Sequence, residues 1–175
     1  MDHRFPWVFP YLEDAKPADA PFPDEPRMRP SVSVRLSGPG GQTDAIFLVD
    51  SGANHVMAAP WVAQAIGVDL EGLPEYGILL GGSERRTRFT DVDLALLPPE
   101  GRDEQPFQWR TQVGFFHRWE PQWAGILGQV GFFDQFTVTM SRLAMILVVE
   151  DVEEIDRRFG ITPGGEPTPP PRFTP

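Results

Sequence analysis

The part of the sequence that decides the fold is residues 47–53, which read Phe-Leu-Val-Asp-Ser-Gly-Ala. Residues 45–49 form a short apolar run that is typical of a buried strand. The run leads directly to Asp50, so burial of the strand would fix the direction in which that carboxylate points. Gly52 lets the backbone turn tightly beside the carboxylate. The pattern therefore predicts a carboxylate, Asp50, in a fixed position at a tight turn.

A similar but weaker pattern, an apolar segment followed by a predicted helix, lies further along the chain. Residues 124–128 read Ala-Gly-Ile-Leu-Gly, which predicts a small, dense turn, and a short helix is expected over residues 129–135. Between the two motifs, the strand predicted over residues 76–80 leads into Gly81-Gly82-Ser83, a hairpin signal. Further strands are expected over residues 31–36, 88–97, 107–116, 136–140 and 143–149, and further helices over residues 60–67 and 152–159.

These motifs, in this order and spacing, resemble those of the retropepsin-like aspartic peptidases, over roughly residues 31–149. The matching residues are the active-site set Asp50, Ser51, Gly52 and Ala53, the flap set Gly81, Gly82 and Ser83, and the second signature Gly125, Ile126, Leu127 and Gly128. The resemblance implies a mostly-β fold. The expected form is a single-lobe acid-protease β-barrel, closed or partly open, with short helices and active as a C2 homodimer.

The resemblance also implies a chemistry, that of an aspartic-type endopeptidase. Water is activated between two carboxylates that share one proton, because two like charges about 3 Å apart cannot both ionise. The chain has no second Asp-Ser-Gly or Asp-Thr-Gly, so the family pattern implies a homodimer with Asp50 of each copy on the twofold axis. Ser51 would then bond across the axis, the Gly52 amide would hold the carboxylates coplanar, and the small Ala53 would leave room for substrate.

The sequence departs from the family at two positions. Asn54 stands where many relatives have an aspartate, and Gln129 stands where many have an arginine that can pair with it. Two neutral amides can still bond to each other, and neither leaves a buried charge unpaired. We therefore interpret the change as a consistent replacement.

Two other function classes stay open. One is a non-catalytic peptide-binding or interaction module on the retropepsin fold; the other is an interaction protein that acts through its aromatic head and proline-rich tail. The intact Asp-Ser-Gly favours the peptidase, because a binding module has no reason to keep a costly pair of like charges on its axis.

Composition excludes several partners and cofactors. The net charge of −10 disfavours nucleic acid, and no stretch approaches the roughly 20 apolar residues that span a membrane. The chain has no cysteine, and its three histidines lack the spacing of a zinc helix, so we expect no cofactor and no metal. The expected partners are a second copy and a peptide or protein substrate, and the expected location is the cytoplasm.

Length and proline content predict the domain organisation. The expected parts are a proline- and aromatic-rich N-terminal extension (1–30), a peptidase domain (31–150), a C-terminal helix (151–162) and a disordered proline-rich tail (163–175). In the extension, aromatic residues alternate at positions 5, 7, 9 and 11, which predicts an extended segment with one apolar face. That face packs on the outside of its own domain or dimer, or it covers the substrate groove as an autoinhibitory strand.

Overall fold

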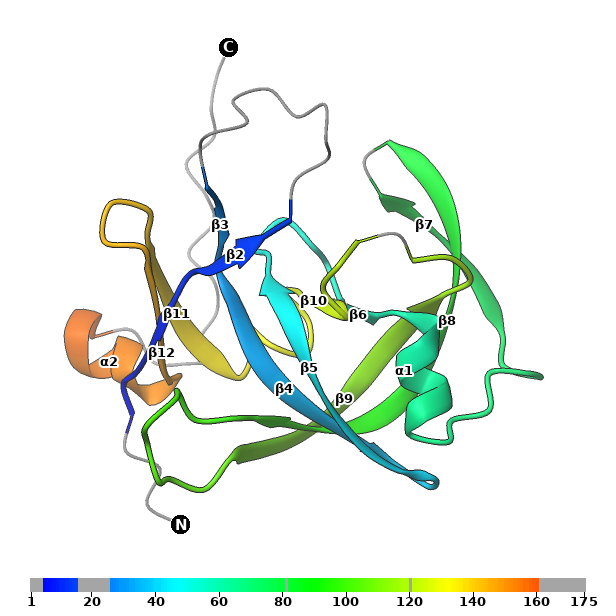
Figure 1. Ribbon diagram of the computed structural model, residues 1–175, viewed down its shortest axis with the longest axis horizontal. Helices are drawn as coiled ribbons and strands as arrows, with labels where there is room; N and C mark the ends of the chain where they lie inside the picture. The colour runs from blue at the N-terminus through cyan, green and yellow to red at the C-terminus, as the bar shows by residue number, and fades with distance from the viewer. Residues whose placement is uncertain (1–4, 16–25, 81, 120, 161–175) are drawn as a thin grey trace.

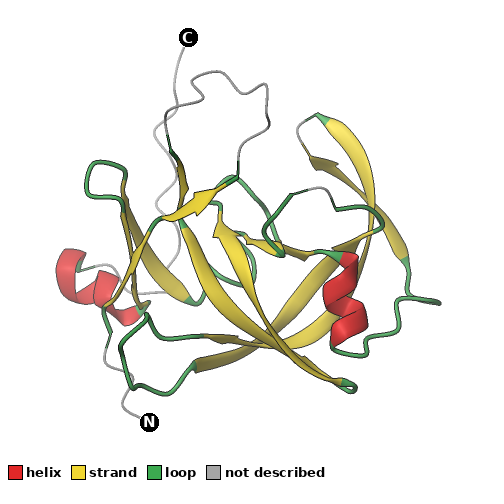
Figure 2. Cartoon of the chain, in the orientation of Figure 1, coloured by secondary structure: helices red, strands yellow, loops and turns green. Residues whose placement is uncertain are grey.

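Six β-strands close into a barrel in the computed structural model, which describes residues 5–15, 26–80, 82–119 and 121–160 (Figure 1). The strands follow one another around the barrel in the order β4 (Ser31–Gly38), β5 (Gly41–Val49), β10 (Gly125–Leu127), β6 (Val56–Ala58), β9 (Phe107–Phe116) and β8 (Ser83–Leu96). The ring closes because β4 pairs with both β5 and β8. Strands far outweigh the helices (Figure 2), so the mostly-β barrel predicted from the sequence is confirmed.

Alternating side chains build the core of the barrel. Val32, Val34 and Leu36 of β4 are fully buried, whereas the residues between them are partly exposed. Phe47 and Val49 of β5 point into the same core. Because successive side chains of a strand point to opposite faces, one face of each strand supplies the core and the other meets solvent. The burial of Val49 places Asp50 at the end of a strand that is held on its inner face.

The second motif is a strand and not the turn predicted from the sequence. β10 lies in the middle of the sheet, parallel to β5 and antiparallel to β6. The helix predicted over residues 129–135 is also wrong, since the chain makes a series of turns there. Val130 instead forms a parallel bridge with His55, and Gly131 has a positive φ of 98°, so the backbone leaves the helical conformation at its first turn.

The aromatic head belongs to the protein's own core. β1 (Trp7–Pro10) pairs with β12 (Ile146–Asp151), which pairs with β11 (Phe136–Ser141) in a three-stranded sheet. Trp7, Phe9 and Tyr11 are at most 7% exposed and join the main hydrophobic cluster. Packing against the chain's own domain is therefore confirmed, but these side chains lie in its core and not on its outside, and the autoinhibitory interpretation of these aromatic residues is wrong. Their side chains are core, so they cannot also fill a substrate groove.

Four short elements lie outside the barrel and the three-stranded sheet. β2 (Leu12–Asp14) pairs with β3 (Arg27–Arg29), and the helices α1 (Pro60–Ala65) and α2 (Glu153–Phe159) lie where helices were predicted. No helix among the described residues is both long enough and apolar enough to cross a membrane. The predicted tail, 163–175, lies outside the described residues, and the division into four parts stays a prediction.

Candidate active site

Asp50 follows the last residue of β5 and is half-buried. The Gly52 backbone N–H donates to Asp50 Oδ1 at 2.9 Å, which fixes the direction of the carboxylate. The Asp50 N–H donates to the Leu127 carbonyl at 3.1 Å, and the Ala53 N–H donates to the Asp50 carbonyl at 3.1 Å. The carboxylate therefore sits in a tight turn whose backbone is bonded both within itself and to the second motif.

The two sequence motifs lie side by side. In the parallel pairing of β5 and β10, Leu127 is opposite Val49, which brings Gly128 level with Asp50. A Cβ at Gly128 would come within 2.5 Å of the His55 carbonyl oxygen and 2.7 Å of the Ala53 carbonyl oxygen. Those distances are far below van der Waals contact, so a glycine is required for the Asp50 loop to pack this closely.

Gln129 supports the Asp50 loop from the second motif. Its side-chain Nε2 donates to the Ser51 carbonyl at 2.7 Å, and its backbone N–H donates to the Ala53 carbonyl at 2.8 Å. Asn54 contacts the same segment through its backbone, because its carbonyl accepts from the Val130 N–H at 2.8 Å. The side chain of Gln129 therefore bonds to the backbone of Ser51. Asn54 follows the turn and meets the second motif through its own backbone carbonyl.

The predicted flap is a two-stranded hairpin of β7 (Glu75–Leu80) and β8. Leu80 pairs with Ser83 at its tip, and Gly82 has a positive φ of 79°, which the tight turn needs. Gly81 lies outside the described residues. Figure 1 shows the hairpin rising on one side of the barrel end where β5 stops, with β2 and β3 on the other side.

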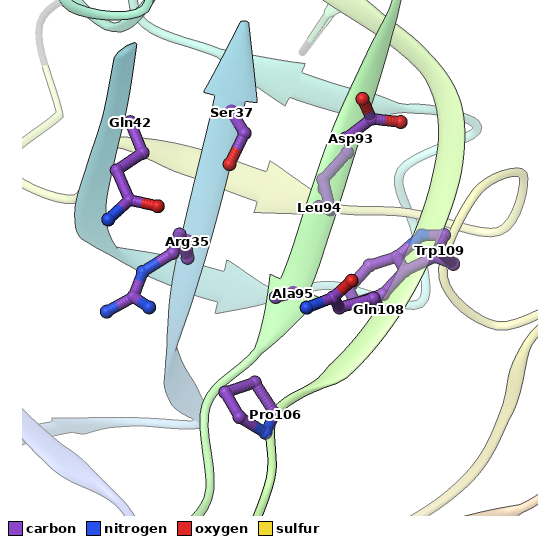
Figure 3. Close-up of a pocket in the computed structure, with 9 residues that line it drawn as sticks. All are labelled: Arg35, Ser37, Gln42, Asp93, Leu94, Ala95, Pro106, Gln108 and Trp109. Atoms are coloured by element: carbon purple, nitrogen blue, oxygen red, sulfur yellow. The ribbon is translucent and has the colours of Figure 1, made fainter. Parts of the chain in front are cut away.

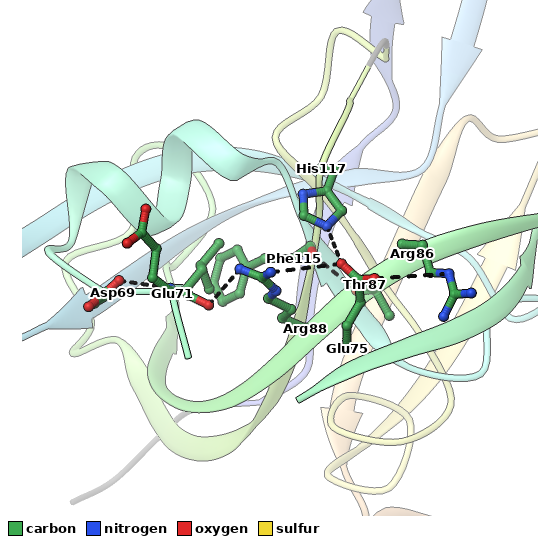
Figure 4. A network of polar contacts seen from close by, with 9 residues as sticks. Asp69, Glu71, Glu75, Arg86, Thr87, Arg88, Phe115 and His117 are labelled. Atoms are coloured by element: carbon green, nitrogen blue, oxygen red, sulfur yellow. Dashed lines mark hydrogen bonds and ion pairs between the residues drawn. The ribbon is translucent and has the colours of Figure 1, made fainter. Parts of the chain in front are cut away.

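A polar network ties the base of this hairpin to the barrel (Figure 4). His117, just after β9, donates from Nε2 to Glu75 Oε1 at 2.5 Å, and Arg88 donates to the Leu70 carbonyl at 2.8 Å. The hydrogen bond from His117, with the positive charges of Arg88 and Arg86 nearby, lowers the pKa of Glu75 below its usual value. The sequence marked His117 only as structural, and no signal could link it to a residue 42 positions away.

A separate pocket, with a volume of about 390 Å³, is lined by residues of β4, β5, β8 and β9 and by Pro106. Figure 3 draws its lining side chains. Arg35 lines it and donates to both carboxylate oxygens of Asp44, at 2.6 and 2.8 Å. Asp44 is six residues before Asp50, which is roughly 20 Å along an extended strand. The pocket contains none of the residues that the sequence marked, and we do not assign it to the site.

Among the described residues, no three histidine, aspartate or glutamate side chains lie close enough together to hold a metal ion.

Similarity to known proteins is found among solved structures and not among sequences. No protein-family model matches the chain, and no curated protein sequence matches it. A crystal structure of a retropepsin-like aspartic protease from Rickettsia conorii is similar to it, with 14% sequence identity and a TM-score of 0.48. The match covers 85% of this chain and 96% of the other. At this level of identity the likeness says nothing about the chemistry of the site.

Proposed function

We propose that this protein is the subunit of an aspartic endopeptidase, a hydrolase in which Asp50 of two copies activates one water molecule. The observation that carries the proposal is the position of Asp50. It stands at the end of a strand that buries Phe47 and Val49 on its inner face, its carboxylate is held by the Gly52 amide, and its loop is bonded by backbone to the Gly128 segment. Catalytic carboxylates need such a fixed geometry, because small displacements lower rates steeply.

In the proposed reaction, one Asp50 carboxylate takes a proton from the attacking water. The second, protonated Asp50 donates its proton towards the carbonyl oxygen of the scissile bond. Ser51, Gly52 and Ala53 shape the turn, and Gln129 keeps the Ser51 carbonyl in place. The hairpin with Gly82 and Ser83 at its tip would cover the bound peptide.

The homodimer is part of the same proposal. One subunit supplies a single carboxylate of this kind, and a twofold axis brings two identical residues together without any further sequence requirement.

We also propose a cytoplasmic location, with peptides or unfolded proteins as substrates and with neither nucleic acid nor membrane as a partner. The absence of cysteine suits a reducing compartment, and the net charge of −10 opposes binding to phosphate backbones.

The test is the cleavage of a fluorescently labelled, unfolded protein by the wild type and by Asp50→Asn, over a range of acidic to neutral pH. We expect Asp50→Asn to abolish cleavage with an unchanged melting temperature, because asparagine keeps the size but cannot act as a base. Asp93→Asn, at an exposed carboxylate on β8, is the matched control and should cleave normally. Full activity of Asp50→Asn, or of a monomer in sedimentation, would refute the proposal. Peptide binding without cleavage would favour the binding module.

A further inference from the structure

The hairpin of β7 and β8 has two faces that differ in charge. In its register Ile78 pairs with Arg85 and Tyr76 pairs with Thr87, and directly paired residues of an antiparallel sheet lie on the same face. Thr87 is fully buried, and its hydroxyl donates to the Phe115 carbonyl of β9 at 3.1 Å. The face that carries these four side chains therefore turns towards the barrel, and we call it the inner face.

The inner face borders the Asp50 loop. Ile78 packs against the apolar cluster that contains Met57 of β6 and Ile126 of β10, and Ala53 of the Asp50 loop packs against the same cluster. Directly opposite residues of an antiparallel pair have Cβ atoms about 4.5–5.5 Å apart, so the residue that pairs with Ile78 lies close to this cluster. A peptide held between the hairpin and Asp50 would meet both residues of that pair.

The other face of the hairpin, the outer face, carries charges that balance one another. Arg86 lies 3.6 Å from Glu84 and 4.0 Å from Glu75, and Arg88 lies 3.9 Å from Glu75 (Figure 4). Gly77 leaves room for this arrangement, because a Cβ there would come within 2.4 Å of Glu84 Oε1. Two guanidinium groups and two carboxylates therefore neutralise each other on the outer face.

Arg85 is the exception among the arginines of the hairpin. Its side chain is exposed, and no hydrogen bond or ion pair holds its guanidinium group among the described residues. An exposed arginine is ordinary on a protein surface, but this one lies opposite Ile78 on the face that a bound peptide would meet. Its fork of N–H donors matches the geometry of a carboxylate. The inner face thus offers a bound molecule one positive charge that the chain itself does not use.

We propose that Arg85 is a specificity-determining residue that binds an acidic side chain of the substrate, glutamate or aspartate, at one position near the cleaved bond. The inference rests on the proposed function. A partly exposed pair of opposite charges changes a binding constant by up to about fivefold. The net charge of −10 acts in the opposite direction, because it repels acidic peptides as a whole. The preference for an acidic residue should therefore be confined to the position that faces Arg85.

The first experiment measures the ratio of kcat/KM for two peptides that differ only in carrying Glu or Gln at one position. The substitution is moved through each position on both sides of the cut, at low ionic strength. We expect the Glu peptide to be preferred about fivefold at one position, with no preference or a preference for Gln elsewhere. High salt should reduce the ratio, since it screens the two charges.

Three variants test whether Arg85 causes this preference. Arg85→Gln should lower the ratio to about one, and Arg85→Glu should make Lys preferred over Gln at the same position. Arg86→Gln is the matched control, because it removes the same charge from the adjacent residue on the outer face, and it should leave the ratio unchanged. A ratio below about twofold at every position, or a ratio that survives Arg85→Gln, would overturn the inference.

The second experiment separates this inference from the proposed function. The Asp50→Asn variant, with and without Arg85→Gln, is titrated with the same two peptides, and tryptophan fluorescence is followed. We expect the Glu peptide to bind about fivefold more tightly, and only where Arg85 is present. Equal affinities, or cleavage without a preference for Glu, would overturn the role of Arg85 and leave the peptidase standing. Selective binding of the Glu peptide with no cleavage by the wild type would overturn the peptidase and leave the acidic-residue site.

Discussion

Replacing Trp7 with alanine should strongly destabilise the protein. The side chain of Trp7 is completely buried, packs against Phe5 and Phe9, and donates from Nε1 to Glu104. Truncating a buried tryptophan to alanine costs about 3–5 kcal/mol, since it removes the apolar contacts and leaves a cavity. For a chain of this length, each kcal/mol lowers the melting temperature by about 2–4 °C. We therefore expect a decrease of about 6–20 °C.

Val8→Ala is the matched control, because Val8 is the next residue on β1 and is 41% exposed. Its truncation removes two methyl groups that are only partly buried, so we expect a loss of about 1 kcal/mol. Both variants are compared with the wild type by calorimetry and by urea unfolding. The ratio of the two losses in stability tests directly whether buried and exposed side chains alternate along β1.

An autoinhibitory head would give the opposite result. If β1 were a detachable strand, Trp7→Ala would leave the melting temperature unchanged and raise the cleavage rate several-fold. A change of less than 2 °C for Trp7→Ala would refute the assignment of this side chain to the core.

The remaining predictions concern Gly128, which packs against the Asp50 loop, and Glu75, at the base of the hairpin of β7 and β8. Gly128→Ala should lower the free energy of unfolding by about 1–3 kcal/mol, because the new methyl group must displace the His55 and Ala53 carbonyls. The same displacement should disturb the position of the Asp50 carboxylate and abolish cleavage. A variant with a normal melting temperature and normal turnover would contradict the close packing. Because the pKa of Glu75 is lowered in the folded protein, Glu75 stabilises the fold above its unfolded pKa of about 4.3, and that stabilisation disappears as the pH falls through the lower folded value. The difference in melting temperature between wild type and Glu75→Gln should therefore be present at pH 5 to 6 and vanish at lower pH, with Glu84→Gln as the control on the same hairpin; a difference that persists at pH 2 would argue against an ionic role.

The sequence was most informative where one local rule decides the conformation. β9 has the predicted bounds, Phe107–Phe116. Asp50 lies at the end of a strand as expected, but that strand buries only Phe47 and Val49, and Ile46 is 38% exposed. The apolar pattern of a strand and the residues of a turn are local features of the chain, so they can be recognised in a single sequence.

The sequence was least informative where distant segments decide the conformation. β10 has three residues, too few for any periodicity, and it is a strand only because β5 and β6 flank it. The contact between His117 and Glu75 joins positions 42 residues apart. The strand predicted over residues 143–149 begins only at Ile146, since Met145 has a left-handed φ of 53° that turns the chain just before it.

The two sides of the site are held by different kinds of interaction, and this should separate their mutational effects. Backbone hydrogen bonds and close glycine packing hold the Asp50 loop, so a change there disturbs the barrel and the carboxylate together. Exposed side chains around Glu75 hold the base of the flap, and exposed ion pairs contribute little to overall stability. Variants at Glu75 or His117 should therefore alter the Michaelis constant and the exchange of flap amides while the melting temperature near neutral pH changes by only a few degrees. Variants at Gly128 should change turnover and melting temperature in proportion.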